Sequence, residues 1–175
     1  MSIEIRNISV TYKTGLFGRG APFRALNDVS LSIEKGSIMG IVGESGSGKS
    51  TLGRVILRLL RPSAGQMMID GVDPYAHESD LFRRQVQAVF QDSGASLNPR
   101  RSVGASIREG LDIHRIGTPS ERDEKVAHLL EQVGLNADYA SRMPHTLSGG
   151  QRQRINIARA VALEPKVLIA DEPVS

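Results

Sequence analysis

The spacing of apolar residues at the start of the chain predicts two strands. Apolar side chains recur at about every second position from Ile3 to Tyr12, and the alternation returns more regularly from Val29 to Ile33. This alternation is typical of strands that turn one face to a core and the other to solvent. Glycine and proline punctuate residues 15–22 between them, which indicates a loop. The chain therefore begins with two half-exposed strands joined by a loop.

Two later segments lack polar alternation and are predicted to be strands buried on both faces. The first is Ile38–Val42, and a helix over Lys49–Leu60, ended by Arg61-Pro62, is expected to follow it after a glycine-rich turn. The second is Lys166–Asp171, which carries a carboxylate at its C-terminal end. Strands and helices in this order indicate an α/β core. Shorter strands are predicted at Gln66–Ile69, closed by a turn at Asp70-Gly71, and at Val86–Phe90.

The pattern changes to a helical period between about residues 92 and 145. One helix is well marked there, because Thr118 and Glu121 fit a capping box and Gly134 can end the helix. A second helix is predicted over Gln151–Leu163. We therefore expect a β region and the start of an α/β core over residues 1–91, a helical subdomain over 92–145, and a return to the core over 146–175.

The segment Gly43–Ser50 fits the phosphate-binding pattern G-x-x-x-x-G-K-[ST], between a predicted strand and a predicted helix. Its glycines let the backbone curl so that successive N–H groups point at one anion, and the helix N-terminus adds its positive dipole end. Lys49 is expected to reach the β and γ phosphates of a nucleotide, and the Ser50 hydroxyl to ligate Mg²⁺. A chance glycine- and serine-rich turn is the alternative, which the strand–turn–helix context disfavours. The candidate nucleotide-binding residues here are Gly43, Glu44, Ser45, Gly46, Ser47, Gly48, Lys49, Ser50 and Thr51.

A pair of carboxylates, Asp171 and Glu172, follows the last predicted strand, where an open parallel sheet places its ligand crevice. Phosphoryl transfer needs one carboxylate to hold Mg²⁺ and a second group to orient and activate the attacking water. Taken alone, Asp-Glu-Pro after a strand is ordinary turn chemistry, but the phosphate-binding pattern upstream favours a catalytic role. We expect Asp171 to hold the metal and Glu172 to act on the water.

Composition and charge narrow the possible functions. The 175 residues are 39% hydrophobic and 23% charged, which is typical of a globular domain. The formal net charge of +3 comes from interspersed charges, so it permits a nucleic-acid partner without indicating one. The chain has no cysteine for disulfides or thiolate metal sites, and its 4 histidines show no metal-ligand spacing. No signal peptide is recognisable and no stretch approaches the roughly 18 apolar residues of a membrane span. A membrane role is expected to need a partner.

The segment Leu147-Ser148-Gly149-Gly150-Gln151, followed by Arg152-Gln153-Arg154, resembles the signature of the ATP-binding cassette (ABC) ATPases. Alone, it also fits an N-cap serine with a flexible lead-in. Its position between the phosphate-binding loop and the carboxylate strand matches the order of the family, and the resemblance covers essentially the whole chain. It implies a P-loop NTPase (RecA-like) α/β core with an N-terminal antiparallel β region and an inserted α-helical subdomain.

Further roles follow from the resemblance. Gln91 matches the glutamine loop of the family, which touches Mg²⁺ and the attacking water, so it is a candidate catalytic and metal-binding residue. Tyr12 lies where the family stacks an aromatic ring on adenine, with an ordinary strand tyrosine as the alternative. In ABC ATPases the signature of one subunit caps the nucleotide held on the phosphate loop of the other. The resemblance therefore implies a dimer that sandwiches two ATP molecules, with signature contacts from Ser148, Gly149, Gly150 and Gln151.

A finer resemblance is to the ATPase subunits of oligopeptide, dipeptide and nickel importers. It rests on Phe90-Gln91-Asp92 with Ser96–Arg100, on Gly15–Arg19 and on Asp171–Ser175, and it departs at Ser93-Gly94, where that group usually has a proline. It implies an ATPase, with ATP and Mg²⁺, that energises import of peptides or a related small solute. The implied partners are a second identical or homologous ABC ATPase, transmembrane permease subunits and, indirectly, an external solute-binding protein. The implied place is peripheral, at the cytoplasmic face of the bacterial inner membrane, and no nucleic acid is expected.

Two other functions stay open. A soluble ABC ATPase that acts on nucleic acid or ribosomes is disfavoured, because no long heptad coiled coil precedes the signature and the aromatic fraction of 4% offers few base-stacking platforms. The second possibility is a fragment that binds ATP without turnover. The chain ends four positions after Asp171, whereas the family continues with a loop that crosses the dimer interface and a histidine that contacts the γ-phosphate. We therefore expect these residues alone to bind ATP weakly, with little or no hydrolysis.

Overall fold

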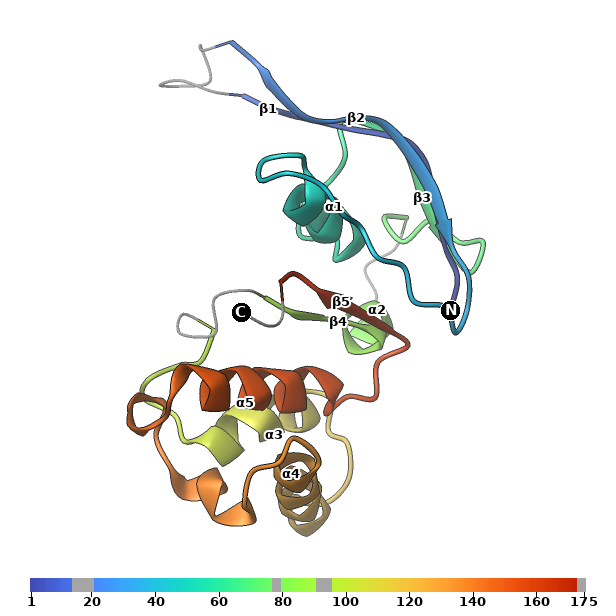
Figure 1. Cartoon of the computed structure of the whole chain (residues 1–175). Coiled ribbons are helices and arrows are strands. Elements are labelled where there is room, and N and C mark those ends of the chain that lie inside the picture. Colours follow the sequence, from blue (N-terminus) through green and yellow to red (C-terminus); the bar gives the residue numbers. More distant parts are fainter. Residues whose placement is uncertain (14–20, 77–79, 91–95, 173–175) are drawn as a thin grey trace. The chain divides into compact units, whose positions relative to one another are not determined.

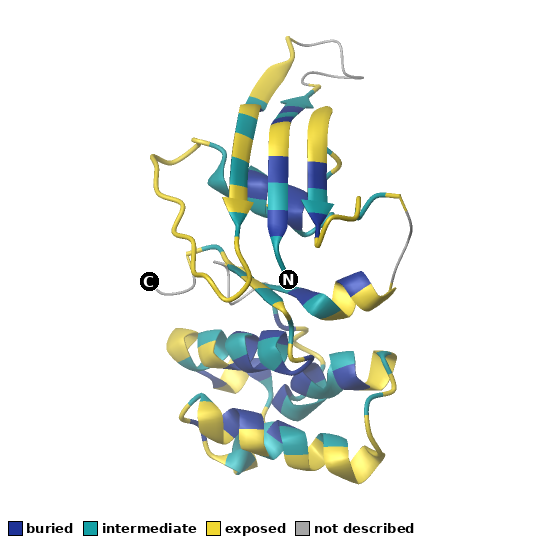
Figure 2. Cartoon of the chain, turned by 90° about the vertical axis from the view of Figure 1, so that its right-hand side faces the viewer, coloured by how far each residue is buried: buried dark blue, intermediate teal, exposed yellow. Residues whose placement is uncertain are grey.

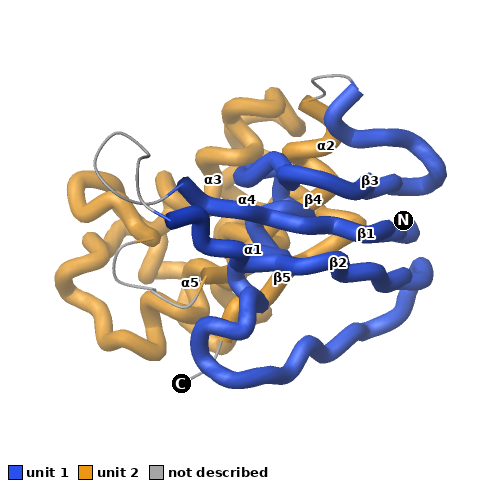
Figure 3. Tube along the Cα trace, turned by 90° about the horizontal axis from the view of Figure 1, so that it is seen from above, with its two compact units in different colours: residues 1–79 blue, residues 80–175 orange. Residues whose placement is uncertain are grey.

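The computed structural model of the chain describes residues 1–13, 21–76, 80–90 and 96–172 (Figure 1). They belong to two compact units, residues 1–79 and residues 80–175 (Figure 3). The expected division at residues 91 and 145 stays a prediction. In chain order the elements are β1 (Ile3–Tyr12), β2 (Phe23–Ile33), α1 (Lys49–Ile56), β3 (Ala64–Ile69), α2 (Asp80–Gln85), β4 (Val86–Val89), α3 (Val103–Ile113), α4 (Pro119–Gln132), the 3-10 helices η2 (Ala137–Ser141) and η3 (Pro144–Thr146), α5 (Gly149–Val161) and β5 (Val167–Ala170).

The first unit is built on an antiparallel sheet in the order β2-β1-β3, with α1 against one face (Figures 1 and 2). Both strands predicted at the start of the chain are confirmed. The second begins earlier than the alternation indicates, at Phe23, because pairing with β1 continues to Tyr12. The buried apolar residues of this unit are Ile3, Ile5, Ile8 and Val10 of β1, Leu26 of β2, Leu52, Val55 and Ile56 of α1, and Met67 and Ile69 of β3.

The imperfect alternation in β1 has a structural cause at Asn7. This residue has a φ of +53°, and the register of β1 against β2 shifts between Ile5 and Ile8. The Asn7 N–H donates to Ser30 Oγ at 2.8 Å, and a Cβ on Gly65 of β3 would lie 2.3 Å from the Asn7 carbonyl oxygen. Only glycine therefore fits opposite this bulge. The bulge returns Ile8 to the buried face, so the apolar residues change from odd to even positions.

The predicted strand at Ile38–Val42 is wrong for this structure. The segment forms no strand, and Ile38 and Val42 are almost fully exposed. A strand exists through hydrogen bonds to at least one neighbouring strand, so an apolar run without such a neighbour stays unpaired. The antiparallel sheet of the first unit is formed by β2, β1 and β3 and does not include this segment. Composition alone therefore did not decide whether this apolar run would pair.

Helix α1 begins at Lys49, as predicted, but ends at Ile56 instead of Leu60. The reason is Arg58, which adopts a left-handed conformation with a φ of +57°. The N–H of Leu60 then donates to the Arg54 carbonyl oxygen at 3.2 Å, which closes the helix end. The hydroxyl of Tyr75 donates to the Leu60 carbonyl oxygen at 3.1 Å and so joins this end to a later turn.

The second unit combines a parallel strand pair with a layer of helices. Helix α5 contacts β4 on one side and α3 and α4 on the other (Figure 1). The capping box of α4 is confirmed: the Glu121 N–H donates to Thr118 Oγ1 at 3.3 Å and the Thr118 N–H donates to Glu121 Oε2 at 2.6 Å. Gly134 ends this segment with a φ of +72°. The buried core of the helices comprises Leu97, Val103, Ile107, Val126, Leu129, Leu130, Leu135, Leu147, Ile155, Ala158 and Ala162.

Strand β5 confirms the last predicted strand but not its burial on both faces. It pairs in parallel with β4, and Leu168 is 45% exposed. Within the described residues β4 is the strand that pairs with it, so one edge of β5 is unpaired. No bounds were predicted from the sequence for helices α2 and α3. The start of α3 is nevertheless capped by a local bond, since Ser102 Oγ accepts the Ala105 N–H at 3.2 Å. Across the ranges that the structure describes, no helix is both long and apolar enough to span a bilayer.

Candidate functional site

The phosphate-binding pattern forms a curled loop that leads into α1. The N–H of Ser47 donates to the Glu44 carbonyl oxygen at 3.2 Å, and Gly46 has a φ of +83°. The Lys49 Nζ lies 2.8 Å from the carbonyl oxygens of both Gly43 and Glu44. The loop therefore curls around its own lysine, whose ammonium group is bonded across the loop.

The start of α1 suits an anion in charge and in space. Gly48 is the N-cap, with a φ of +102°, and the helix has neither a side-chain cap nor an acidic residue in its first turn. Its first N–H groups and its positive dipole end are thus available to another acceptor. A Cβ on Gly48 would lie 2.6 Å from the Ala25 carbonyl oxygen, so the helix start packs directly on β2. Ser50 is exposed in the first turn and Thr51 is half-buried beside it.

Tyr12 lies at the same end of the first unit as this loop. It is the last residue of β1 and pairs with Phe23 of β2, whose side chain is 56% exposed. Ala25, the residue in close contact with Gly48, lies two positions further along β2. Tyr12 is half-buried, and its pairing partner Phe23 lies two positions from the residue of β2 that the phosphate-binding loop contacts.

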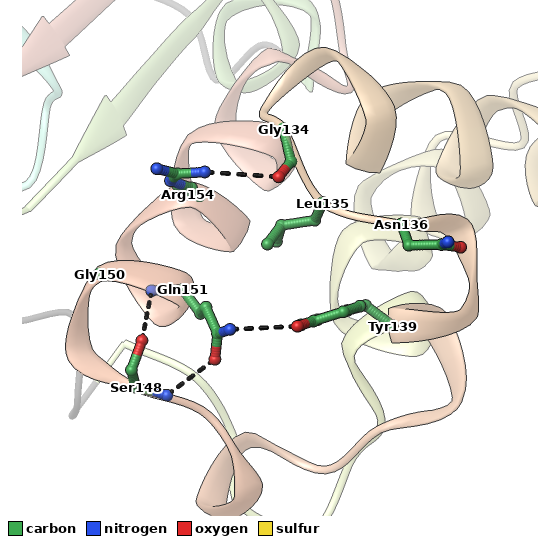
Figure 4. Close-up of a pocket in the computed structure, with 8 residues that line it drawn as sticks. All are labelled: Gly134, Leu135, Asn136, Tyr139, Ser148, Gly150, Gln151 and Arg154. Atoms are coloured by element: carbon green, nitrogen blue, oxygen red, sulfur yellow. Dashed lines mark hydrogen bonds between the residues drawn. The ribbon is translucent and has the colours of Figure 1, made fainter.

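The signature segment opens α5 with two reciprocal hydrogen bonds (Figure 4). The Gln151 N–H donates to Ser148 Oγ at 3.2 Å, and the Ser148 N–H donates to Gln151 Oε1 at 3.0 Å. Because Ser148 Oγ accepts a bond from the backbone, its hydroxyl hydrogen can donate to another group. Gly149 and Gly150 are exposed, with no atom within 4 Å of a Cβ built on either. The hydroxyl and the glycine N–H groups form a donor cluster at the positive end of α5.

A hollow of about 420 Å³ lies beside this donor cluster, between the first turns of α5 and the segment that follows α4. In Figure 4 the Gln151 and Tyr139 side chains point toward each other, and Gln151 Nε2 donates to Tyr139 Oη at 3.1 Å. On the α5 side, Arg154 Nη1 lies 3.4 Å from the Gly134 carbonyl oxygen. These contacts join the signature to the end of the α4 segment.

The two carboxylates leave β5 differently. The Asp171 N–H donates to the Val89 carbonyl oxygen at 3.0 Å, so the strand ladder continues up to Asp171, which is half-buried. Glu172 is exposed and has a φ of +46°, which turns the chain sharply. The side chains of the two residues therefore face different surroundings, as a division of roles between them requires.

Each unit holds part of the predicted site. The first brings together Tyr12, the phosphate-binding loop and Ser50, while the second contains the signature, Asp171 and Glu172. Gln91 lies outside the described residues. Among the residues described, no group of three or more His, Asp or Glu is placed to hold a metal ion. Of the three predicted metal ligands, Ser50 belongs to the first unit and Asp171 to the second, and the third is Gln91.

Two residues that make contacts on or through α5 were not identified from the sequence. One is Tyr139, and the other is Arg159 of α5, whose Nη1 donates to the carbonyl oxygen of Ser96. Burial of the guanidinium lowers the pKa of Arg159, and the charge of Glu109 opposes the shift. The Gln151–Tyr139 contact spans 12 positions and the Arg159–Ser96 contact spans 63. Neither separation belongs to a helical or strand period, so the sequence pattern does not predict these contacts.

Comparison with known proteins places these features in a family. The family model described as ABC transporter matches residues 26–175. The chain is 50% identical, over 99% of its length, to the oligopeptide transport ATP-binding protein OppF of Bacillus subtilis, and covers 57% of that protein. It is 46% identical, again over 99% of its length, to OppF of Streptococcus mutans, of which it covers 56%. The chain thus spans about half the length of the curated relatives it matches.

The fold also matches a solved structure. A dimeric, post-hydrolysis state of the ATP-binding cassette MJ0796, bound to ADP and Pi, aligns with a TM-score of 0.87 and 32% identity over 98% of this chain and 74% of that chain. This likeness confirms the predicted P-loop NTPase core with an antiparallel β region and a helical subdomain. The order of phosphate-binding loop, signature and carboxylate strand, the matching family model and these relatives together show that the chain belongs to the ABC transporter family.

Proposed function

We propose that the protein is the ATP-binding and ATP-hydrolysing subunit of an ABC importer for peptides or a related small solute such as nickel. The observation that carries this proposal is the loop curled around Lys49 at the uncapped, positive start of α1. Such a loop offers backbone N–H groups and an ammonium group to a chain of phosphates. The peptide class is supported by the relatives in Bacillus and Streptococcus, which are named oligopeptide transport ATP-binding proteins.

In this proposal Gly43–Thr51 binds the phosphates of ATP and Tyr12 stacks on the adenine. Lys49 supplies a positive charge to the β and γ phosphates. The placement of Tyr12 is supported by the contact between Gly48 and Ala25, because this contact holds the loop near the end of β2 that pairs with Tyr12. Tyr12 offers an aromatic face of the kind that stacks with any base.

Hydrolysis is assigned to four polar residues. Ser50, Gln91 and Asp171 are the proposed Mg²⁺ ligands, and their hydroxyl, amide and carboxylate oxygens suit that ion. When bound, Mg²⁺ neutralises the charge that develops on the phosphate oxygens. Glu172 orients the attacking water and accepts its proton, with Gln91 as the second residue in contact with that water. The exposure of Glu172, next to a half-buried Asp171, supports this division of roles.

The signature is proposed to act on the nucleotide of a partner subunit. Ser148, Gly149 and Gly150 form a second donor cluster, and one nucleotide cannot easily use two such clusters of the same chain. Two subunits, identical or homologous, would therefore sandwich two ATP molecules, and hydrolysis would open the dimer. The dimer is proposed to drive transmembrane permease subunits from the cytoplasmic face of the membrane, with a solute-binding protein outside.

Reconstitution of the protein, as encoded in its genome, with its permease subunits in liposomes tests the proposal. We expect ATP hydrolysis that accelerates when the solute-binding protein and a peptide are added, and peptide uptake that requires ATP. The same preparation is tested for binding to DNA and RNA at two salt concentrations. Tight binding with a steep salt dependence, without ATP-dependent uptake, would show instead a soluble ATPase that acts on nucleic acid.

A further inference from the structure

The side chain of Gln151 is engaged at both ends of its amide (Figure 4). Its Oε1 accepts the Ser148 N–H at 3.0 Å, and its Nε2 donates to Tyr139 Oη at 3.1 Å. The orientation of the amide is unambiguous, because a backbone N–H can only donate and must therefore face Oε1. Tyr139 Oη then accepts the Nε2 hydrogen. A hydrogen-bonded chain thus runs from Tyr139 through Gln151 to Ser148, the N-cap residue of α5.

Tyr139 is itself held firmly. Its ring packs against the buried core of the helices, and the guanidinium carbon of Arg142 lies 3.8 Å from the ring centre. The carbonyl oxygen of Arg142 accepts the Val103 N–H at 2.9 Å, and its guanidinium pairs with Asp138 at 3.6 Å. The Tyr139 side chain, whose phenol oxygen bonds to Gln151, is therefore held by core packing and by the Arg142 guanidinium over its ring. Arg142 is in turn held by its bonds to Val103 and Asp138.

We propose that Tyr139 is a positioning residue for the signature. By accepting Gln151 Nε2, it fixes the glutamine rotamer that holds the Ser148 N–H, and with it the Ser148 hydroxyl and the N–H groups of Gly149 and Gly150. The donor cluster is then ordered before a nucleotide arrives, so less conformational entropy is lost on contact. This inference rests on the proposed function, in which the cluster contacts the partner's ATP.

The hydroxyl of Tyr139 is the part that matters for this role. Without it, the core packing and the contact with Arg142 remain, but Gln151 Nε2 loses its acceptor. The glutamine side chain is half-exposed and has several rotamers, so it can then leave the cap. The expected result is a looser cluster rather than an unfolded one, because Tyr139→Phe changes a single oxygen atom.

The test uses Tyr139→Phe in the protein as encoded in its genome and has two arms. The first measures amide hydrogen exchange at Ser148 without nucleotide; we expect exchange to rise several-fold, roughly as the loss of one hydrogen bond allows. The second measures ATP-dependent dimerisation in a Glu172→Gln background. There we expect about three- to tenfold weaker dimerisation, while ADP binding to the separate subunit stays within about twofold of the parent.

Two controls separate positioning from general destabilisation. Tyr75→Phe also removes a phenol oxygen that makes a hydrogen bond, but in the first unit, and is expected to leave Ser148 exchange unchanged. In a Gln151→Ala background, Tyr139→Phe is expected to cause no further loss of dimerisation, since the two residues act through one bond. The inference is overturned if Tyr139→Phe weakens dimerisation equally in the Gln151→Ala background. It is also overturned if Tyr139→Phe alone leaves hydrogen exchange at Ser148 unchanged. If the parent does not dimerise with ATP, the proposed function is wrong, and the exchange arm still decides whether Tyr139 orders the cap.

Discussion

Lys49 Nζ donates to the carbonyl oxygen of Gly43 at 2.8 Å, so the lysine of the phosphate-binding loop is bonded to the first residue of that loop. A second bond of the same length goes to the Glu44 carbonyl oxygen. An ammonium group has three hydrogens, so one hydrogen remains for a phosphate oxygen. The side chain therefore has two tasks, to hold the curl of the loop and to bind the anion.

Replacement of Lys49 by alanine removes both tasks at once. We expect Lys49→Ala to weaken ATP binding by about 10- to 100-fold, because charge-assisted hydrogen bonds contribute roughly 1.5–3 kcal/mol. Isothermal titration calorimetry with ATP measures the change. Lys35→Ala, at an exposed lysine of the same unit, is the control and is expected to bind as the parent does. Equal affinity in the two variants would remove Lys49 from the site.

Tyr12 tests the adenine end of the proposed site. Tyr12→Ala is expected to lower ATP affinity by about 1–3 kcal/mol, the usual contribution of one base stacked on an aromatic ring. Tyr12→Phe keeps the ring and is expected to keep most of the affinity. Binding of tripolyphosphate, which has no base, should be the same in all three proteins. If Tyr12→Ala weakens ATP and tripolyphosphate equally, its effect is on the fold of the loop and not on adenine.

Glu172→Gln separates binding from hydrolysis. The amide keeps the size of the side chain but cannot accept a proton from water, so we expect turnover to fall by about 10²–10⁴-fold while ATP binding persists. The closed dimer should then accumulate, which size-exclusion chromatography with ATP detects. Glu131→Gln, at an exposed position of α4, should hydrolyse ATP normally. Normal turnover in Glu172→Gln would assign the base to another residue.

Local signals explain what could be predicted from the sequence. Thr118 and Glu121 are three positions apart and bond to each other's backbone, so the α4 cap is visible in the pattern itself. The phosphate-binding loop is predictable for the same reason, since Lys49 bonds to carbonyl groups five and six residues before it. Such short-range bonds do not depend on the rest of the fold.

The failures concern contacts between distant segments. Ile38–Val42 has the composition of a buried strand, but pairing depends on neighbours that the run itself does not specify. The shift of apolar residues at Asn7 is visible in the sequence, yet its cause involves Gly65, 58 positions later. The bond between Gln151 and Tyr139 spans twelve positions and two elements, with no periodic spacing to predict it.

Helix α3 offers a matched test of the helical core. Ile107 is fully buried, whereas Ile113 on the same helix is 69% exposed. Ile107→Ala is expected to lower the free energy of unfolding by about 2–5 kcal/mol, since it removes buried methyl groups and leaves a cavity. Ile113→Ala should change it by less than about 0.5 kcal/mol. Urea denaturation followed by circular dichroism measures both, and equal losses would mean that Ile107 is not part of a close-packed core.

Acid should weaken the α4 cap. The Thr118 backbone N–H, and then its side chain, hold the pKa of Glu121 below its ordinary value of 4.5. A lowered pKa in the folded state means that the carboxylate stabilises the fold fully above about pH 4.5 and loses this effect as the pH falls through the lowered value. Glu121→Gln should therefore have a lower urea midpoint than the parent at pH 7, and the difference should shrink as the pH falls from 4.5 through the lowered pKa. Glu131→Gln, at the other end of α4, is the control; an equal pH response in both variants would show that the cap is not responsible.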